Sequence, residues 1–285
     1  MPVKGVIIAA GYGSRFLPVT RVLPKEMLPI IDRPSMDWIL EEFAAAGIED
    51  VLVVTSRRKK VLDDWFDRQP ELEAALAHKP ASTRAKLAPP PLRVQFIRQQ
   101  KMQGTGQALL LARTFAGVDP VVVAFPDDLF TGTNCSAELI QAHEATGCSV
   151  LATQTVDGDV SRYGVVETLP REDGHIGVRR IVEKPAPGEQ PSQQVSFGRY
   201  LYTPQIFEEL ARGLAAHSNG EFFPADAINT LGARGQVVAA EIGGTRWDTG
   251  EPMGLLHTTI ALACEHPEYG PAFTTWLREF TKTVK

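Results

Sequence analysis

Cysteine is scarce in this sequence of 285 residues, which contains only Cys135, Cys148 and Cys264. The three are widely spaced, odd in number and form no Cys-x-x-Cys pair, which argues against a disulfide framework or a zinc site and suits a reducing compartment. A basic surplus is also lacking, because 29 Lys and Arg face 34 Asp and Glu. Wholesale binding to nucleic acid or to an anionic membrane therefore loses its electrostatic driving force. Any anionic ligand must be held by a few placed cations and backbone amides.

Long hydrophobic runs are absent as well. No stretch approaches the roughly 18 apolar residues of a membrane span, and the run from Val6 to Ala10 is too short for the core of a signal peptide. Hydrophobic residues make up 44% and charged residues 22% of the chain, close to the average of globular proteins. The sequence predicts a soluble, cytoplasmic protein with one large domain or two modest ones.

The first half of the chain alternates strand-like and helix-like patterns. Continuous apolar runs are typical of strands buried on both faces. The expected strands are Val3–Ala10, Asp50–Thr55, Arg93–Gln99, Val121–Phe125 and Ser149–Val156. The expected helices are Met36–Ala46, Lys59–Phe66, Thr105–Ala116 and Ala137–Thr146, and residues 79–91 are expected to form an exposed excursion. Strands that alternate with helices of about 10–15 residues predict right-handed crossovers and a doubly wound, mainly parallel α/β sheet.

The pattern becomes less regular after about residue 160. A hairpin is expected from Tyr163–Leu169 and Ile176–Glu183, followed by a flexible loop rich in proline and glycine. Further strands are expected at Val195–Tyr202 and Val237–Ile242, and a Gly-rich loop at Gly243–Gly250. The remaining expected helices are Pro204–Ala216, Pro252–Cys264 and Pro271–Lys282.

The strongest signal for chemistry directly follows the first strand, in the run Ala-Ala-Gly-Tyr-Gly-Ser-Arg from Ala9 to Arg15. Glycines let the backbone approach a ligand closely, and successive amides can form an anion-holding concavity. Arg15 adds a fixed fork of hydrogen-bond donors. Taken alone, however, two glycines and an arginine are equally compatible with a tight turn and a solvated side chain.

Two other phosphate-binding motifs are excluded. A dinucleotide-binding fold requires a third glycine where Phe16 stands, and an acid at the end of the second strand, where Thr55-Ser56-Arg57 stand. A Walker loop requires Gly-Lys-Ser/Thr, which occurs nowhere in the chain. No catalytic triad is visible, and the six histidines show no clustered ligand spacing.

A second motif, Pro-Lys-Glu-Met-Leu-Pro from Pro24 to Pro29, carries Lys25 between two stiffening prolines. Together with the segment Gly-x-Gly-Ser-Arg-Phe-Leu-Pro, it resembles the sugar-1-phosphate nucleotidyltransferases, and most closely their bacterial branch that uses UTP and glucose 1-phosphate. The segment Phe222–Asp226 departs from this family, in which more polar residues stand there. The resemblance continues in family order over residues 3–250, at Gln99, Gly104–Ala108, Pro126–Asp128, Arg162–Val165, Val182–Pro185, Gly198–Tyr200 and Trp247–Gly250.

The resemblance implies a Rossmann-like sheet with an inserted sugar-side β lobe, and a Mg²⁺-dependent reaction. An oxygen of glucose 1-phosphate would attack the α-phosphorus of UTP in line, giving UDP-glucose and pyrophosphate. A phosphate nucleophile is already deprotonated at neutral pH, so cations and a metal matter more than a general base. The expected organisation is one nucleotidyltransferase domain, with a nucleotide-side half at about 1–158, a sugar-side lobe at about 159–250 and C-terminal helices at about 251–285. These helices would form the interface of a homodimer or homotetramer.

Residue roles follow from the resemblance at the matching positions. The implied catalytic cations are Arg15, Lys25 and Lys184. The implied nucleotide-binding residues are Ala10, Gly11, Gly13, Ser14, Glu26, Gln99, Gly104 and Asp127. The implied sugar-binding residues are Gly164, Glu183 and Lys184. The implied Mg²⁺ ligands are Asp127, at the end of an apolar strand, and Asp248, in the Gly-rich loop, because Mg²⁺ typically uses one or two carboxylates plus substrate phosphates.

Other interpretations stay open at the level of sequence. The same chemistry with dTTP or another sugar 1-phosphate fits, because the base and sugar contacts are largely made by backbone. A non-catalytic sugar-nucleotide sensor is a third possibility, although a sensor need not keep the full set of charges. Taken alone, Glu183-Lys184 is more typical of an exposed ion pair. The run from Arg57 to Lys60 is expected to be a solvated helix start rather than a nucleic-acid patch.

Overall fold

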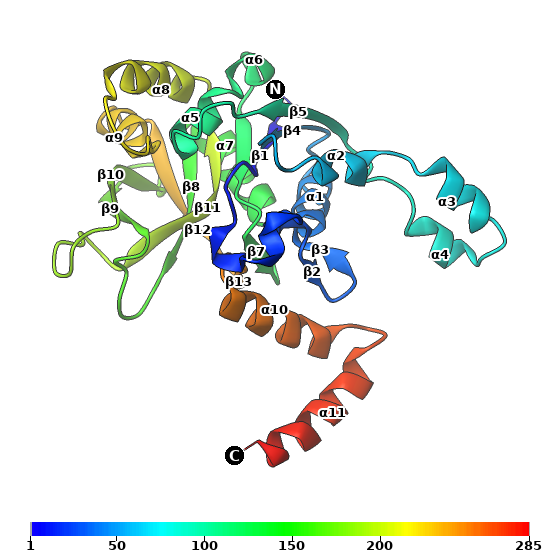
Figure 1. The fold of residues 1–285 in the computed structure, drawn as a ribbon. Coiled ribbons are helices and arrows are strands. Elements are labelled where there is room, and N and C mark those ends of the chain that lie inside the picture. The colour runs from blue at the N-terminus through cyan, green and yellow to red at the C-terminus, as the bar shows by residue number, and fades with distance from the viewer. Residues whose placement is uncertain (1, 285) are drawn as a thin grey trace.

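The computed structural model describes residues 2–284, and its centre is a sheet of nine strands (Figure 1). The strands lie in the order β5-β4-β1-β6-β11-β8-β12-β10-β9. They are the nine segments that the sequence predicts as strands. Their bounds are Lys4–Ile8 (β1), Asp50–Thr55 (β4), Arg93–Arg98 (β5), Val121–Ala124 (β6), Ser149–Thr155 (β8), Gly164–Pro170 (β9), Ile176–Glu183 (β10), Gln194–Tyr202 (β11) and Val237–Glu241 (β12).

The sheet is mixed rather than mainly parallel. Strands β5, β4, β1 and β6 run parallel, as the alternation of strands and helices predicts. Beyond β6, however, β11 is antiparallel to β6, β8 and β9, and β10 is antiparallel to β9 and β12, so that only β8 and β12 are parallel there. The prediction of a mainly parallel sheet is therefore wrong for this part. The physical reason is that β9 and β10 form a hairpin, and a tight turn can only join antiparallel strands. The expected sugar-side lobe is an extension of the main sheet.

Helices cover both faces of the sheet and create two apolar layers. Strand β1 is apolar throughout because its side chains are buried on both faces of the sheet: Ile7 belongs to one layer, and Val6 and Ile8 belong to the other. Helices α1 and α7 pack on the first face, and α5, α6, α8 and α9 pack on the second. Their bounds are Ser35–Ala45 (α1), Thr105–Leu110 (α5), Arg113–Ala116 (α6), Cys135–Thr146 (α7), Gln205–Ala216 (α8) and Ala225–Ala233 (α9).

A buried ion pair links the first layer to the sheet. Arg199 on β11 is fully buried and donates two hydrogen bonds to Glu42 of α1, from Nε to Oε1 at 2.8 Å and from Nη2 to Oε2 at 2.7 Å. Burial favours the protonated form of Glu42, but Arg199 more than offsets it, so the pKa of Glu42 lies below its ordinary value. The matched residue Arg199 therefore holds the fold together beneath the site instead of facing it.

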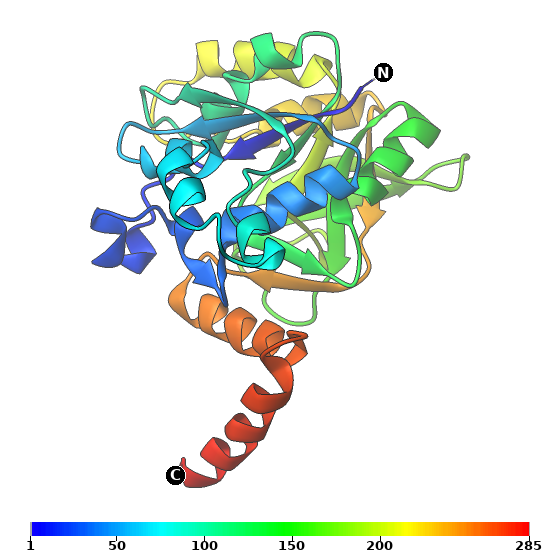
Figure 2. The same cartoon turned by 90° about the vertical axis from the view of Figure 1, so that its right-hand side faces the viewer.

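Two parts of the chain extend away from the sheet in Figure 1. The first contains the short helices α3 and α4 in a mostly exposed segment, as expected for residues 79–91, whereas α2 packs on the core through Leu62. The second is the C-terminal pair of helices, which Figure 2 shows from the side. Within residues 2–284, no helix is both long and apolar enough to pass through a membrane. The bounds of these helices are Val61–Phe66 (α2), Pro70–Ala75 (α3), Ala81–Ala85 (α4), Pro252–Glu265 (α10) and Gly270–Thr283 (α11).

Several short elements are not predicted by the sequence. The most important is β13, since the sequence predicts a loop at residues 243–250 and Thr245–Asp248 instead pairs antiparallel with Asp128–Thr131 (β7). A strand of four residues between glycines has too few side chains to show a period of two. The others are β7, Pro29–Ile30 (β2), Arg33–Pro34 (β3), α9 and the 3₁₀ helices Ser14–Phe16 (η1), Val19–Arg21 (η2) and Lys25–Met27 (η3).

Candidate active site

The loop after β1 contains glycines whose backbone is open or bent. Apart from Gly11 itself and its two chain neighbours, no heavy atom lies within 4 Å of the position that a Cβ would take at Gly11, so a ligand has room to approach this backbone. Gly13 has a φ of 66°, a conformation that favours glycine, and its carbonyl accepts a hydrogen bond of 2.8 Å from Thr20 Oγ1. Ala10 is buried at the base of the loop, and Ser14 is exposed at the start of η1. The backbone of this loop is therefore accessible to a ligand at Gly11.

Lys25 and Asp127 form an ion pair at the carboxyl end of β6. Lys25 Nζ lies 2.5 Å from Asp127 Oδ2. Burial lowers the pKa of Lys25, but the Asp127 carboxylate more than offsets this, so that the pKa of Lys25 lies above its ordinary value. Burial likewise raises the pKa of Asp127, and Lys25 reverses the direction and holds it below its ordinary value. Both groups are charged at neutral pH, at the sheet edge where open α/β folds bind ligands.

Asp248 lies beside Asp127 because β13 pairs with β7. Asp248 ends β13 and stands opposite Asp128 in the ladder. The Thr249 amide donates to the Asp127 carbonyl at 2.7 Å and fixes the two segments to each other. A Cβ at Gly250 would lie 2.8 Å from Asp127 Oδ2 and 3.1 Å from Asp248 Oδ1. Two carboxylate oxygens therefore lie close to one point, which is open because residue 250 is a glycine.

A third carboxylate, Asp128, is held by Arg246. Arg246 Nε donates to Asp128 Oδ1 at 2.6 Å, and the Gly198 amide donates to Asp128 Oδ2 at 3.2 Å. Burial and the neighbouring carboxylates of Asp127 and Asp248 raise the pKa of Asp128 although Arg246 opposes the rise. Arg246 is not among the site residues predicted from the sequence. Its position directly before the matched block Trp247–Gly250 is the signal that points to it.

A cavity of about 330 Å³ opens beside these carboxylates. Its lining includes Asp127, together with the three predicted sugar-side residues Gly164, Glu183 and Lys184. Gly164 and Glu183 are partners in the β9–β10 ladder, and a Cβ at Gly164 would lie 3.1 Å from Glu183 Oε2. Partial burial raises the pKa of Glu183, and the nearby Lys184 counteracts part of this effect. The tertiary structure thus brings nucleotide-side and sugar-side residues to one cavity.

Lys184 has an unusual backbone for its residue type. Its φ is 47°, and its amide donates to the Tyr163 carbonyl at 3.0 Å. A left-handed conformation in a residue other than glycine costs on the order of 1–3 kcal/mol and is common at functional sites. Lys184 Nζ lies 5.6 Å from the centre of the Phe223 ring, which also lines the cavity. Phe223 belongs to the segment that departs from the family pattern, and it adds an apolar wall to the sugar side.

Gln99 and Gly104 form a separate polar group at the end of β5. Gln99 Nε2 donates to the Gly104 carbonyl at 3.0 Å and to Gln107 Oε1 at 2.7 Å. Gly104 has a φ of 99°, and a Cβ there would lie 2.6 Å from the carbonyl oxygen of Phe222. The Phe222 carbonyl also accepts from the Gly106 amide at 2.9 Å. Glycine is therefore required at positions 104 and 106 because Phe222 packs against them. Phe222 also connects the nucleotide-side loop to the wall that Phe223 forms.

Glu26 and Lys59 pair with each other in the interior. Both Glu26 oxygens accept from Lys59 Nζ, at 2.7 and 2.8 Å, and neither side chain is more than 6% exposed. Burial lowers the pKa of Lys59, and Glu26 only partly opposes this. The expectation that Arg57–Lys60 is a solvated helix start is wrong for Lys59, because a carboxylate far away in sequence compensates its burial. Glu26, expected at the nucleotide, faces this lysine.

The predicted site residues thus fall into three groups. Asp127, Gly164, Glu183 and Lys184 line one cavity, and Lys25 is paired with Asp127. Arg15 and Asp248 adjoin it through Gly250, whose carbonyl accepts from Arg15 Nη1 at 3.5 Å. The remaining residues, Ala10, Gly11, Gly13, Ser14, Gln99 and Gly104, lie in the loops after β1 and β5, and Glu26 is buried.

An open α/β sheet with cations, carboxylates and a glycine loop at its ligand-binding edge is typical of enzymes that handle phosphates. The family model for nucleotidyl transferases matches residues 4–263 of the chain. The chain belongs to the nucleotidyl transferase family.

Several known proteins are similar to this chain along nearly its whole length. The chain is 41% identical over 290 residues to a UTP–glucose-1-phosphate uridylyltransferase of Streptococcus pneumoniae, covering 99% of this chain and 97% of that protein. It is 37% identical over 281 residues to the uridylyltransferase of Staphylococcus epidermidis, covering 97% of both. A solved structure, the UTP-bound UGPase from Acinetobacter baumannii, superposes with a TM-score of 0.88 at 31% identity, covering 98% of this chain and 99% of that one. The resemblance deduced from the sequence is confirmed.

Proposed function

We propose that the protein transfers a uridylyl group from UTP to glucose 1-phosphate, giving UDP-glucose and pyrophosphate. The observation that carries this proposal is the 41% identity to a uridylyltransferase over 99% of the chain. In the reaction, an oxygen of glucose 1-phosphate bonds to the α-phosphorus of UTP, while the bond from that phosphorus to the oxygen of pyrophosphate breaks. No proton needs to be removed from the nucleophile, which agrees with a site built from cations and carboxylates.

The residues of the nucleotide side bind and neutralise the triphosphate. The backbone from Ala10 to Gly13 and the exposed Ser14 hold phosphate oxygens, and Arg15 and Lys25 balance their charge. Both hydrogens of the Gln99 amide are already donated within the protein, so its Oε1 is the atom left to accept from an N–H of the base. The Gly104 backbone lies at the same edge of the base.

The residues of the sugar side orient the acceptor. Lys184 contacts both the acceptor phosphate and the α-phosphate, and so brings two anions together that would otherwise repel each other. Glu183 accepts hydrogen bonds from sugar hydroxyls, and Gly164 offers backbone beside the ring. Phe223 packs against an apolar face of the sugar.

Asp127 and Asp248 fit a bound Mg²⁺. Their oxygens converge at Gly250, where a side chain would fill the space. Mg²⁺ is commonly held by one or two carboxylates plus substrate phosphates, rather than by a cage made only of protein ligands. Residues 2–284 contain no cluster of three or more His, Cys, Asp or Glu side chains arranged to hold a metal. When bound, Mg²⁺ would neutralise phosphate oxygens and the charge that develops on pyrophosphate.

Pyrophosphate release from pairs of nucleoside triphosphates and sugar 1-phosphates tests the substrates. We expect release only when UTP and glucose 1-phosphate are present together. Equal or better turnover with dTTP would assign the protein to thymidylyl transfer, and turnover with another sugar 1-phosphate would change the acceptor. Tight binding of the nucleotide sugar without turnover of any pair would indicate a sensor.

The organisation predicted from the sequence remains our proposal. One nucleotidyltransferase domain would contain a nucleotide-side half at about 1–158, a sugar-side lobe at about 159–250 and the C-terminal helices from about 251. The cavity supports the division, because its lining includes Asp127 from the first half and Glu183 and Lys184 from the second. The cytoplasmic location also remains a prediction. It agrees with Cys135, Cys148 and Cys264, which are all free thiols.

The C-terminal helices support a homo-oligomer. On α10, Met253, Leu256 and Ile260 share one face and are between 41% and 57% exposed. On α11, Trp276 and Phe280 stack on each other while exposed, and Gly270 is the one buried residue of this helix. Isolated helices of this length are marginal in water, and most helices are stabilised by packing of an apolar face. Because α11 carries both acidic and basic side chains, a second copy of this chain suits it better than an anionic surface.

Replacing Trp276 with glutamate is expected to weaken self-association by at least about tenfold, as removal of a buried aromatic residue at an interface commonly does. Sedimentation velocity over a range of protein concentrations measures the change. Thr281→Glu is the matched control, because this exposed residue lies on another face of α11. A wild-type protein that is monomeric at all concentrations would exclude this interface.

A further inference from the structure

We propose that the buried Glu26–Lys59 pair positions the nucleotide-binding groups, by tying the loop after β1 to the segment that carries Lys25. This inference rests on the uridylyl transfer proposed above, and it gives a role to a lysine that the reaction itself does not use.

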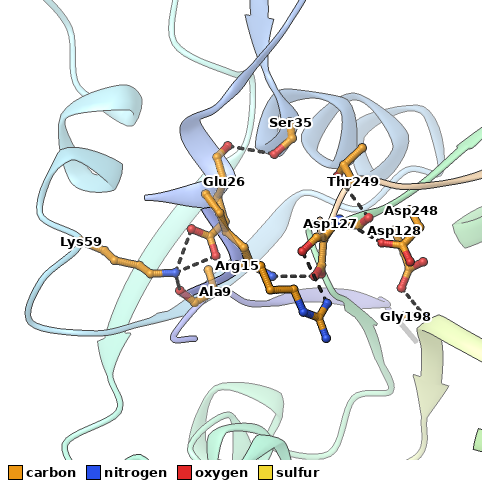
Figure 3. Close-up of polar contacts among 12 residues, drawn as sticks. Ala9, Arg15, Glu26, Ser35, Lys59, Asp127, Asp128, Gly198, Asp248 and Thr249 are labelled. Carbon is orange, nitrogen blue, oxygen red and sulfur yellow. Dashed lines mark hydrogen bonds and ion pairs between the residues drawn. The ribbon is translucent and has the colours of Figure 1, made fainter. Parts of the chain in front are cut away.

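Lys59 donates hydrogen bonds to three oxygen atoms of the protein. Its Nζ lies 2.7 and 2.8 Å from the two oxygens of Glu26 and 2.6 Å from the carbonyl oxygen of Ala9 (Figure 3). A lysine ammonium has three hydrogens, and three oxygens accept them. With a side chain that is 6% exposed, Lys59 cannot reach a substrate without breaking this arrangement. It is therefore a positioning residue.

The three linked groups come from three distant parts of the chain, and two of them border the site. Ala9 lies two residues before the open backbone at Gly11, and Glu26 directly follows Lys25. The Glu26 carbonyl is itself fixed, because it accepts from Ser35 Oγ at 3.1 Å. Lys25 is thus restrained twice, by Asp127 at its ammonium and by Glu26 at its backbone.

This arrangement has a consequence for kinetics. The Glu26–Lys59 pair restrains groups that contact the triphosphate. Gly164, Glu183 and Lys184 on the sugar side make no contact with this pair. Misplacing catalytic groups by about 1 Å can lower the rate by on the order of 10²-fold. Loss of the Glu26–Lys59 pair should therefore lower kcat/KM for UTP and leave the KM for glucose 1-phosphate nearly unchanged. A pair that only stabilised the fold would not separate the two substrates.

The test compares Lys59→Met with the double variant Glu26→Met/Lys59→Met. The single variant leaves a carboxylate buried without its partner, which destabilises the fold, whereas the double variant leaves no buried charge. We expect the double variant to recover most of the melting temperature. Its kcat/KM for UTP should nevertheless stay about 10²-fold below wild type, with the KM for glucose 1-phosphate within a factor of two. Lys60→Met, which removes the exposed neighbouring lysine, is the matched control and should match wild type.

A double variant with wild-type stability and wild-type UTP kinetics would overturn the proposal. If it does not fold, Glu26→Gln serves instead, since an amide keeps the shape of Glu26 but weakens its bond to Lys59. We expect its affinity for UTP, measured by calorimetry, to fall about tenfold, and an unchanged affinity would equally overturn the proposal. Calorimetry also separates this inference from the function. A wild-type protein that binds UTP but turns over no substrate pair would refute the proposed function. The comparison of UTP affinities would still show whether the Glu26–Lys59 pair positions the nucleotide-binding groups.

Discussion

Replacement of Asp127 or Asp248 by asparagine is expected to lower turnover by about 10²–10³-fold, the usual cost of losing a preorganised electrostatic contact. Asparagine keeps the shape of the side chain but removes the negative charge that favours Mg²⁺. The fold should survive both changes, because Asp127 and Asp248 are 24% and 36% exposed and the bond that joins their segments uses the backbone carbonyl of Asp127. The melting temperature of Asp248→Asn should stay close to wild type. That of Asp127→Asn should be somewhat lower, because Lys25 loses the carboxylate of its ion pair.

Metal binding gives an independent measurement of the same prediction. With Mn²⁺ as the probe and UTP present, calorimetry should show weaker metal binding in both variants. Chelation should abolish turnover in the parent, and added Mg²⁺ should restore it. Asp157→Asn, at an exposed position, is the matched control. Unchanged metal affinity in both variants would refute the assignment of Asp127 and Asp248 as ligands. Full activity of the parent protein in the presence of chelator would refute a role for Mg²⁺ in the reaction.

Lys184→Ala is expected to lower kcat/KM for glucose 1-phosphate by about 10²–10³-fold while UTP binds as before. The physical reason is that its ammonium serves the acceptor phosphate and the phosphorus under attack. The strained backbone at Lys184, with a φ of 47°, supports a role at the site, because such strain is retained where the surrounding structure requires it. Alanine removes the charge and keeps a side chain at the same position.

Steady-state kinetics with each substrate varied in turn, together with calorimetry of UTP binding, checks this prediction. Arg179→Ala is the matched control. Arg179 is an exposed cation on β10, the strand that ends directly before Lys184; it pairs with Glu167 and does not line the cavity. Equal kinetics in Lys184→Ala and wild type would return Glu183-Lys184 to an exposed ion pair. A loss of UTP affinity as large as the loss for the acceptor would place Lys184 on the nucleotide instead.

Much of the candidate site could be predicted from the sequence because its motifs are local. Gly11 and Gly13 follow an apolar strand, and the prolines beside Lys25 are visible in the sequence itself. Burial and partners were harder to predict. Lys59 looks solvated beside Arg57, Arg58 and Lys60, and its carboxylate partner Glu26 lies 33 positions away. A charged residue in a charged run gives no sign that a distant group will neutralise it.

The central strands β1, β4, β6 and β8 could be predicted from the sequence because their apolar runs reflect burial on both faces, and the family could be predicted because its motifs stand in family order along the chain. The pairing in the second half of the sheet required the structure, because strand direction depends on which neighbour each strand meets. The structure also decided that Asp127 and Asp248 meet at Gly250, because β13 pairs with β7. Convergence of distant side chains depends on ladder register, and a strand of four residues is too short to specify that register locally.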